Sequence, residues 1–271
     1  MRKVRLLIVV ASLMAPLFWS GTLQASDLSN TNRGNDVNLG SPGPGGGMAE
    51  VTEIPATVTE SSVVTGRVVD ANCWLSTGVQ GESYRDSAIA CARNGTPLAI
   101  LTESGSLVYP LMVDADGNTK PDMDTLAPYA EHYVRVTGRL IQRGKERAIM
   151  VSGISAAPEP KKPGTFEVKE TPGTEVDGRV VDLGAWIASG NKGTADAKIV
   201  QACSVGGDPL VVVTKAGRIY YPVTKTMPSS PVGTSWLSKY CARQVRVTGA
   251  TIARGEARGI VISSVDQSSS Q

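Results

Sequence analysis

The chain contains one stretch of sequence twice, and this repeat limits its fold more than any other feature does. Residues 66–70 read Gly-Arg-Val-Val-Asp, and the same five residues return at 178–182. Val-Arg-Val-Thr-Gly occurs at 134–138 and again at 245–249, with one residue lost between the two matches. Two copies of roughly 90 residues predict two small domains rather than one large domain.

The segments outside the copies differ from them in composition. Gly, Pro, Ser and Asn are frequent before the first copy, and Pro158, Pro160 and Pro163 fall between the copies. Such segments predict a flexible tether and a stiffer linker that spaces the two domains apart. The expected order is a signal peptide (1–25), a disordered tether (26–61), domain 1 (62–155), a Pro-rich linker (156–175), domain 2 (176–266) and a tail (267–271).

The first residues are typical of an export signal. Arg2, Lys3 and Arg5 precede an apolar run from Leu6 to Trp19, and cleavage is expected after Ala25. The alternative is an uncleaved anchor, although the run is shorter than the ~20 residues that cross a bilayer comfortably. We therefore expect an exported protein, periplasmic or extracellular, with no stable membrane span after cleavage.

The net charge gives no reason to expect a nucleic-acid ligand. The full chain has 27 basic and 25 acidic residues. The signal contains three of the basic residues and none of the acidic ones, so the mature chain would have 24 basic residues against 25 acidic ones. A nearly neutral exported protein has no bulk attraction for polyanions.

Each copy predicts the same order of elements: a strand, a short helix, two strands, a second short helix and two strands. In copy one the helices are expected at 83–93 and 124–130, and hairpin turns fall at Glu103–Gly105 and Arg143–Lys145. Five strands with a helix between the third and fourth resemble the OB-fold. This resemblance implies a mainly β protein with two tandem OB-like five-stranded barrels, each with short helices.

Copy one also loosely resembles a group of small exported bacterial proteins. That group has Asp-x-x-Cys-Tyr-Leu, Gly-x-x-His, Cys-Ala-x-x-Cys and Gly-x-Pro motifs, and this chain has Asp70 to Leu75, Gly81 to Tyr84, Ser87 to Cys91 and Gly95 to Pro97. Tyr84 replaces the His and Ser87 replaces a Cys, so the resemblance implies no intact metal site.

The four cysteines suggest two disulfides within domains. Cys91 and Cys203 are equivalent in the repeat, whereas Cys73 aligns with Ala185 and Cys241 with Ala130. This exchange of Cys and Ala predicts the pairs Cys73–Cys91 and Cys203–Cys241. The alternative is a reactive or metal-binding pair of thiols.

No motif points clearly to catalysis, a metal or a cofactor. Asp114, Asp116, Asn118, Asp122 and Asp124 form an acidic stretch, but its Gly is misplaced for a calcium loop and no Glu closes it. His132 is the single histidine and aligns with Arg243. We expect no catalytic residues, no metal ligands and no cofactor.

Basic and aromatic side chains provide a weak set of ligand-binding candidates. OB-folds often combine such residues on one face. The candidates are Trp74, Tyr109, Arg135, Arg139, Trp186, Tyr221 and Arg246. The aromatic residues recur at equivalent positions, so packing in the core is the alternative role.

The sequence therefore predicts a non-enzymatic exported binding or scaffold protein of the bacterial envelope. Its partner would be another envelope protein, a polysaccharide or a lipid headgroup. The alternative is a protein that handles metals or redox equivalents through its Cys and acidic residues. The sequence leaves the oligomeric state open.

Overall fold

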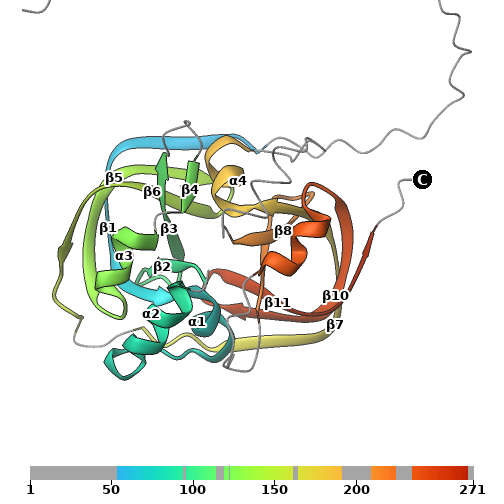
Figure 1. Cartoon of the computed structure of the whole chain (residues 1–271), viewed down its shortest axis with the longest axis horizontal. Coiled ribbons are helices and arrows are strands. Elements are labelled where there is room, and N and C mark those ends of the chain that lie inside the picture. The colour runs from blue at the N-terminus through green and yellow to red at the C-terminus, as the bar shows by residue number, and fades with distance from the viewer. Residues whose placement is uncertain are drawn as a thin grey trace, which may run out of the picture. The chain divides into compact units, whose positions relative to one another are not determined.

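A computed structural model describes residues 54–93, 96–113, 119–121, 123–160, 164–190, 209–223 and 234–267. Strands predominate in this part of the chain, and they form two closed barrels (Figure 1). The prediction of a mainly β protein with two OB-like five-stranded barrels and short helices is confirmed.

The first barrel consists of five strands, and a sixth, shorter strand pairs with one of them. Its strands are β1 (Ala56–Asp70), β2 (Leu98–Leu101), β3 (Leu107–Val113), β5 (Tyr133–Arg143) and β6 (Glu146–Ala156), and β4 (Thr119–Pro121) pairs with β3. β1 pairs with β2 and β5, β2 with β3, and β5 with β6. A parallel pairing of β3 with β6 closes the barrel, as in an OB-fold.

The second barrel repeats this order strand by strand. It contains β7 (Val168–Asp182), β8 (Leu210–Thr214), β9 (Ile219–Pro222), β10 (Gln244–Arg254) and β11 (Ala257–Gln267). The parallel pair is β9 with β11. The register shifts at Thr137/Gly138 on β5 and at Thr248/Gly249 on β10, so both barrels have a bulge at the same repeated glycine.

The strands form where apolar and polar residues alternate. On β5, Val134 and Val136 are buried, whereas Arg135 and Thr137 point outward. β1 begins at Ala56 and β7 at Val168, so both first strands include residues that the sequence assigned to the tether and the linker. In these extensions β1 pairs with the far end of β5, and β7 pairs with the far end of β10.

Short helices connect the strands. The two expected helices of copy one correspond to η1 (Glu82–Tyr84) with α2 (Arg85–Arg93), and to α3 (Met123–Leu126) with η2 (Ala127–Tyr129). η3 (Thr234–Tyr240) lies between the third and fourth strands of the second barrel. Two further helices, α1 (Ala71–Thr77) and α4 (Leu183–Ser189), were not predicted.

α1 and α4 begin and end in the same way. The Asp70 carboxylate accepts a hydrogen bond from the Cys73 N–H at 2.9 Å, and the Asp182 carboxylate accepts one from the Ala185 N–H at 2.6 Å. These contacts cap the N-termini of the two helices. Gly78 and Gly190 end the helices with φ of 80° and 68°, a conformation that glycine adopts without steric cost.

The described residues form a separate apolar cluster inside each barrel and a further cluster to which both barrels contribute. The cluster inside barrel 1 includes Val68, Ile100 and Ile149, and that inside barrel 2 includes Val180 and Val212. The shared cluster contains buried residues from both copies, such as Val69 and Leu111 from the first and Val211 and Ala257 from the second. The prediction that the linker holds the two domains apart was therefore wrong.

α1 and α4 supply the centre of this shared core. Trp74 and Leu75 of α1 belong to it, as do Trp186 and Ile187 of α4. α1 contacts β10 and β11 of the second barrel, and α4 contacts β4, β5 and β6 of the first. Each barrel thus packs its first helix against the other barrel.

Repeat-equivalent tyrosines also meet in the shared core. Tyr109 of β3 stacks on Tyr221 of β9 with ring centroids 5.5 Å apart and ring planes at 26°. Such a contact between equivalent residues is what a local two-fold relation between the barrels produces. Stacked aromatic pairs contribute about 1 kcal/mol beyond the burial of their area.

Two arginines donate hydrogen bonds to α1 and α4, each from the opposite barrel. Arg254, at the end of β10, donates hydrogen bonds to the Leu75 carbonyl at 3.2 Å and to the Phe166 carbonyl at 2.9 Å. Arg143, its equivalent at the end of β5, donates to the Ile187 carbonyl at 3.1 Å and to the Ile54 carbonyl. Both side chains therefore satisfy carbonyls near the C-terminal end of a helix from the other barrel.

The C-terminal glycines leave room for these arginines. A Cβ added at Gly78 would lie 2.7 Å from Nη1 of Arg254, and one at Gly190 would lie 2.7 Å from Nη1 of Arg143. Phe166, which precedes β7, packs beside this contact. Its ring meets the Trp74 ring edge to face, with 5.9 Å between the ring centroids. We call this contact between the two barrels the seam. It depends on equivalent residues of both copies.

Replacing either arginine with alanine should destabilise the whole protein. Arg254→Ala leaves two carbonyls without their donor in a buried place, so we expect a loss of about 2–3 kcal/mol in the free energy of unfolding. Arg143→Ala should cost a similar amount. Arg139→Ala, on the exposed face of the same strand as Arg143, is the control, with a change within ~0.5 kcal/mol. Urea unfolding measures all three, and equal losses for Arg139 and Arg254 variants would contradict the structural role of the seam.

Candidate functional site

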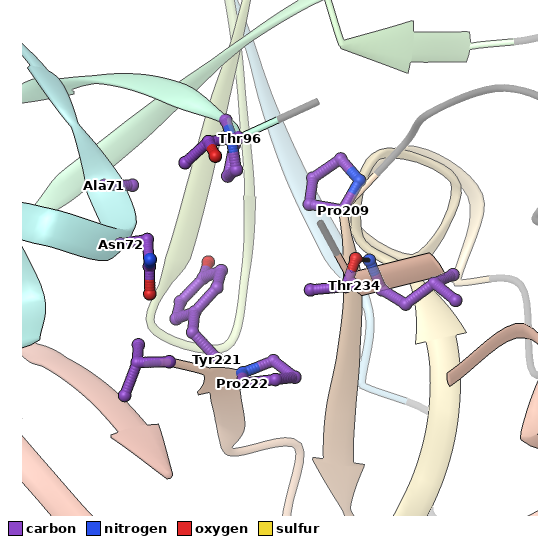
Figure 2. Close-up of a pocket in the computed structure, with 10 residues that line it drawn as sticks. Ala71, Asn72, Thr96, Pro209, Tyr221, Pro222 and Thr234 are labelled. Atoms are coloured by element: carbon purple, nitrogen blue, oxygen red, sulfur yellow. Dashed lines mark hydrogen bonds between the residues drawn. The ribbon is translucent and has the colours of Figure 1, made fainter. Parts of the chain in front are cut away.

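Two hollows differ strongly in size and lining. The smaller one lies at the seam, between Thr96 and Pro97 of the first barrel and Pro209, Tyr221 and Pro222 of the second. Figure 2 shows the Tyr221 ring standing between Asn72 on one side and Thr234 on the other. Its cavity of about 20 Å³ has room for roughly one water molecule, which is too little for an organic ligand.

The larger hollow belongs to barrel 1 and has a volume of about 540 Å³. We call it the polar pocket. It is lined by Arg67, Gly81, Glu82, Tyr129, Glu131, His132, Tyr133, Ala156, Ala157 and Glu159. Its size falls in the range of small-molecule sites, and its walls contain charged and aromatic groups.

Glu131 is the most unusual residue of the polar pocket. It follows η2 with φ of 64°, and its N–H donates to the Val68 carbonyl at 2.7 Å. This backbone conformation is uncommon for a residue other than glycine. The side chain is directed inward, because only 2% of the residue is exposed.

The two carboxylate oxygens of Glu131 have different surroundings. Oε2 accepts a hydrogen bond from the Gly81 N–H at 2.6 Å, whereas Oε1 is buried and has no hydrogen-bond partner in the protein. Burial raises the pKa of Glu131 to about 7, although the Gly81 N–H, the Arg67 charge and the Asp70 N–H act to lower it and the Asp70 charge acts to raise it. The protein leaves one acceptor of a buried carboxyl group without a donor.

Arg67 of β1 is engaged on three sides. Its Nη1 donates to the Glu131 carbonyl at 2.6 Å, its Nη2 pairs with the Glu159 carboxylate, and its guanidinium lies 5.0 Å from the centre of the Tyr133 ring. Glu159 follows β6 on the segment that leads to the second barrel. The positive charge of Arg67 is therefore already neutralised within the pocket.

Glu82 and His132 lie at the exposed side of the pocket. The His132 Nε2 is 3.8 Å from a Glu82 carboxylate oxygen, and the two side chains are 49% and 74% exposed. Such an exposed pair contributes little to stability.

A buried polar cluster adjoins the pocket at the start of α1. The Asp70 carboxylate caps α1, and the Tyr84 hydroxyl donates to its second oxygen at 3.3 Å. Cys73 and Cys91 lie close to the same carboxyl group, and desolvation raises the pKa of Asp70 despite these hydrogen bonds. Burial, together with the Asp70 charge, raises the pKa of Cys73 to about 12 and raises the pKa of Cys91 as well.

Barrel 2 repeats the backbone of the site without its chemistry. Ala242 stands where barrel 1 has Glu131, with the same φ of 64°, and its N–H donates to the Val180 carbonyl at 2.9 Å. Arg243 and Gln244 replace His132 and Tyr133. The unusual backbone is therefore part of the duplicated scaffold, whereas the carboxyl group is specific to barrel 1.

The structure distributes the predicted ligand-binding residues differently from the expectation. The aromatic candidates are buried in the shared core, so they do not form an open face: Trp74, Tyr109, Trp186 and Tyr221. Arg135 and Arg139 are exposed on β5, and Arg246 on β10 forms hydrogen bonds of 2.7 and 2.9 Å with Asp177. None of these seven residues lines the polar pocket, and the basic ones do not converge with the aromatic ones.

The disulfide and calcium hypotheses have separate outcomes. Cys73 and Cys91 are neighbours but are present as thiols and not bonded to each other. Cys203 lies outside the described residues, so the pair Cys203–Cys241 does too. Among the acidic stretch, Asp114, Asp116, Asn118 and Asp122 also lie outside them.

The part of the chain that the structure describes contains no group of three His, Cys, Asp or Glu side chains arranged to hold a metal ion. No helix within the same residues has the length and apolar character needed to cross a membrane. Comparisons with family models, with curated proteins and with solved structures find no match.

The sequence analysis assigned His132 to no site, and it did not single out Glu131, Glu82, Arg67 or Glu159. One signal was present, because Glu131 aligns with Ala242 in the repeat. Because barrel 2 folds with alanine at this position, the Glu131 carboxyl group is not required for the barrel fold. Its burial could not be read from the sequence, since most glutamates are exposed.

The Glu131 carboxyl group should make stability depend on pH. Its pKa of about 7 lies above the ordinary value of 4.5, so its contribution to stability is complete below about pH 4.5 and lost as the pH rises through 7. Glu131→Gln should therefore gain on the wild type between pH 4.5 and 8, by about 3 kcal/mol at most.

Urea unfolding at both pH values measures this difference, with Glu82→Gln as the exposed control that should show little change. A constant difference between wild type and Glu131→Gln across this range would show that Glu131 titrates normally.

Proposed function

We propose that this is an exported, non-enzymatic binding protein of the bacterial envelope, with the polar pocket of barrel 1 as its ligand site. Barrel 2 then acts as a structural partner that holds barrel 1 through the shared core. The classes of partner are another envelope protein, a polysaccharide or a lipid headgroup, and the signal at residues 1–25 supports export.

The observation that carries this proposal is that equivalent backbone positions in the two barrels have the same conformation but different side chains. Glu131 and Ala242 have the same φ and equivalent backbone hydrogen bonds, yet a buried carboxyl group is present in barrel 1 alone of the two. A buried acid with an unpaired oxygen lowers stability, and the hydrogen bond from Gly81 to its other oxygen leaves the unpaired oxygen unexplained. A ligand that pairs with the oxygen would account for it.

The alternative of a metal- or redox-handling protein has less support. Thiolates are the reactive and metal-binding form of cysteine, and burial of Cys73 beside Asp70 raises the pKa of its thiol to about 12. Cys73 is therefore almost fully protonated at neutral pH. We propose instead that Cys73 with Cys91, and likewise Cys203 with Cys241, form structural disulfides after export to an oxidising compartment.

The disulfide proposal predicts that the unreduced, denatured mature protein has no free thiols. A disulfide within barrel 1 would stabilise it by roughly 3 kcal/mol, so reduction or Cys91→Ala should lower the unfolding midpoint. Thiol titration before and after reduction provides the count. Two or more free thiols in the unreduced protein would favour the redox alternative.

Capture from envelope extract tests the binding function. Immobilised mature protein should retain a partner or ligand that the Glu131→Gln variant fails to retain. Glu175→Gln, an exposed carboxylate on β7 of barrel 2, is the matched control and should behave as wild type. A partner retained equally by all variants would place the binding surface outside the polar pocket.

A further inference from the structure

We infer that the polar pocket binds a primary ammonium group carried on an alkyl chain, as in a lysine side chain or a polyamine. This inference rests on the proposed binding function and names the chemistry of its ligand. It follows from the charges in the pocket, from the unpaired Glu131 oxygen and from the shape of the donor set.

The balance of charge favours a cation. Three carboxylates line the pocket, from Glu82, Glu131 and Glu159, against one guanidinium from Arg67. Glu159 already pairs with that guanidinium, and the Glu131 main-chain carbonyl accepts another of its hydrogen bonds. Two carboxylates therefore remain for a ligand, with His132 beside the more exposed one.

The unmet hydrogen bond also favours a donor. Oε1 of Glu131 is buried without a partner in a side chain that is almost entirely enclosed. An ammonium group has three N–H donors and no acceptor, so a rotation of the Glu131 side chain that brings Oε1 to the pocket lets the two groups pair without leaving an acceptor unmatched. An anionic ligand would face Glu131 with the same sign of charge.

The arrangement favours an organic cation over a metal ion. Among the described residues no three His, Cys, Asp or Glu side chains converge as metal ligands. The acidic groups are instead spread over a pocket of about 540 Å³ whose walls include Tyr129, Tyr133, Ala156 and Ala157. Aromatic rings and methyl groups suit an alkyl stem, while the carboxylates receive its charged end.

Binding should weaken as the pH falls. Burial holds the pKa of Glu131 near 7, and an ammonium group needs the ionised form of this acid. The charged and titratable groups that line the pocket or act on Glu131 are Arg67, Asp70, Glu82, His132, Tyr129, Tyr133 and Glu159.

Titration calorimetry on the mature protein tests the inference with spermidine and with the N-acetyl amide of lysine. At least one should bind at pH 8, more weakly at pH 6, and at least tenfold more weakly to Glu131→Gln. Glu175→Gln should bind within twofold of wild type. If only the lysine amide binds, the source is a protein partner, and if only spermidine binds, it is a free polyamine.

Glu82→Gln provides a second variant, because this exposed side chain can be changed without disturbing the fold. It should weaken binding several-fold. Equal binding to wild type and to both variants, or no binding of either amine at millimolar concentration, overturns the ammonium inference. An anionic probe, glutarate, separates the two proposals. Binding of glutarate that depends on Arg67 keeps the pocket as a ligand site and rejects the cation, whereas loss of all binding together with a capture experiment that retains nothing rejects both.

Discussion

The structure depends on a reciprocal contact: each of the two equivalent barrels packs one short helix against the other barrel. α1 packs against the second barrel and α4 against the first, and Arg254 and Arg143 donate hydrogen bonds to carbonyls at the ends of these helices. Helices of seven residues are too short to be stable alone. They persist because Asp caps, Gly ends and a shared apolar core fix them, and this core joins the two copies into one folding unit.

This union explains how duplication and specialisation coexist. The residues at the seam occur in both copies, including Tyr109 with Tyr221, Trp74 with Trp186 and the two arginines. The aromatic residues among them pack in the shared core and form no open face. The polar pocket shares no lining residue with the small seam hollow, and its Glu131, His132 and Tyr133 are replaced by other residues in barrel 2. Changes in the pocket can therefore alter binding without altering the contact between barrels.

The repeat, the β-branched strands and the turn residues were enough to predict both barrels. The helices α1 and α4 were missed because seven residues show too little periodicity, although an Asp before each and a Gly after each were present. The shared core was missed for a different reason. Trp74 and Trp186 were weak candidates for a binding face with core packing as the alternative, and the prolines of the linker suggested separation. The burial of Glu131 depends on the tertiary packing of barrel 1, which no residue pattern reveals.

The most direct test of this account is to cut the linker. A specific protease site placed between Lys161 and Lys162 allows the folded protein to be cleaved between its barrels. The two fragments should remain associated during size-exclusion chromatography and unfold in a single urea transition, because each buries its first helix in the other. Fragments that separate and unfold independently would contradict a shared core and restore the picture of two barrels joined only by a spacer.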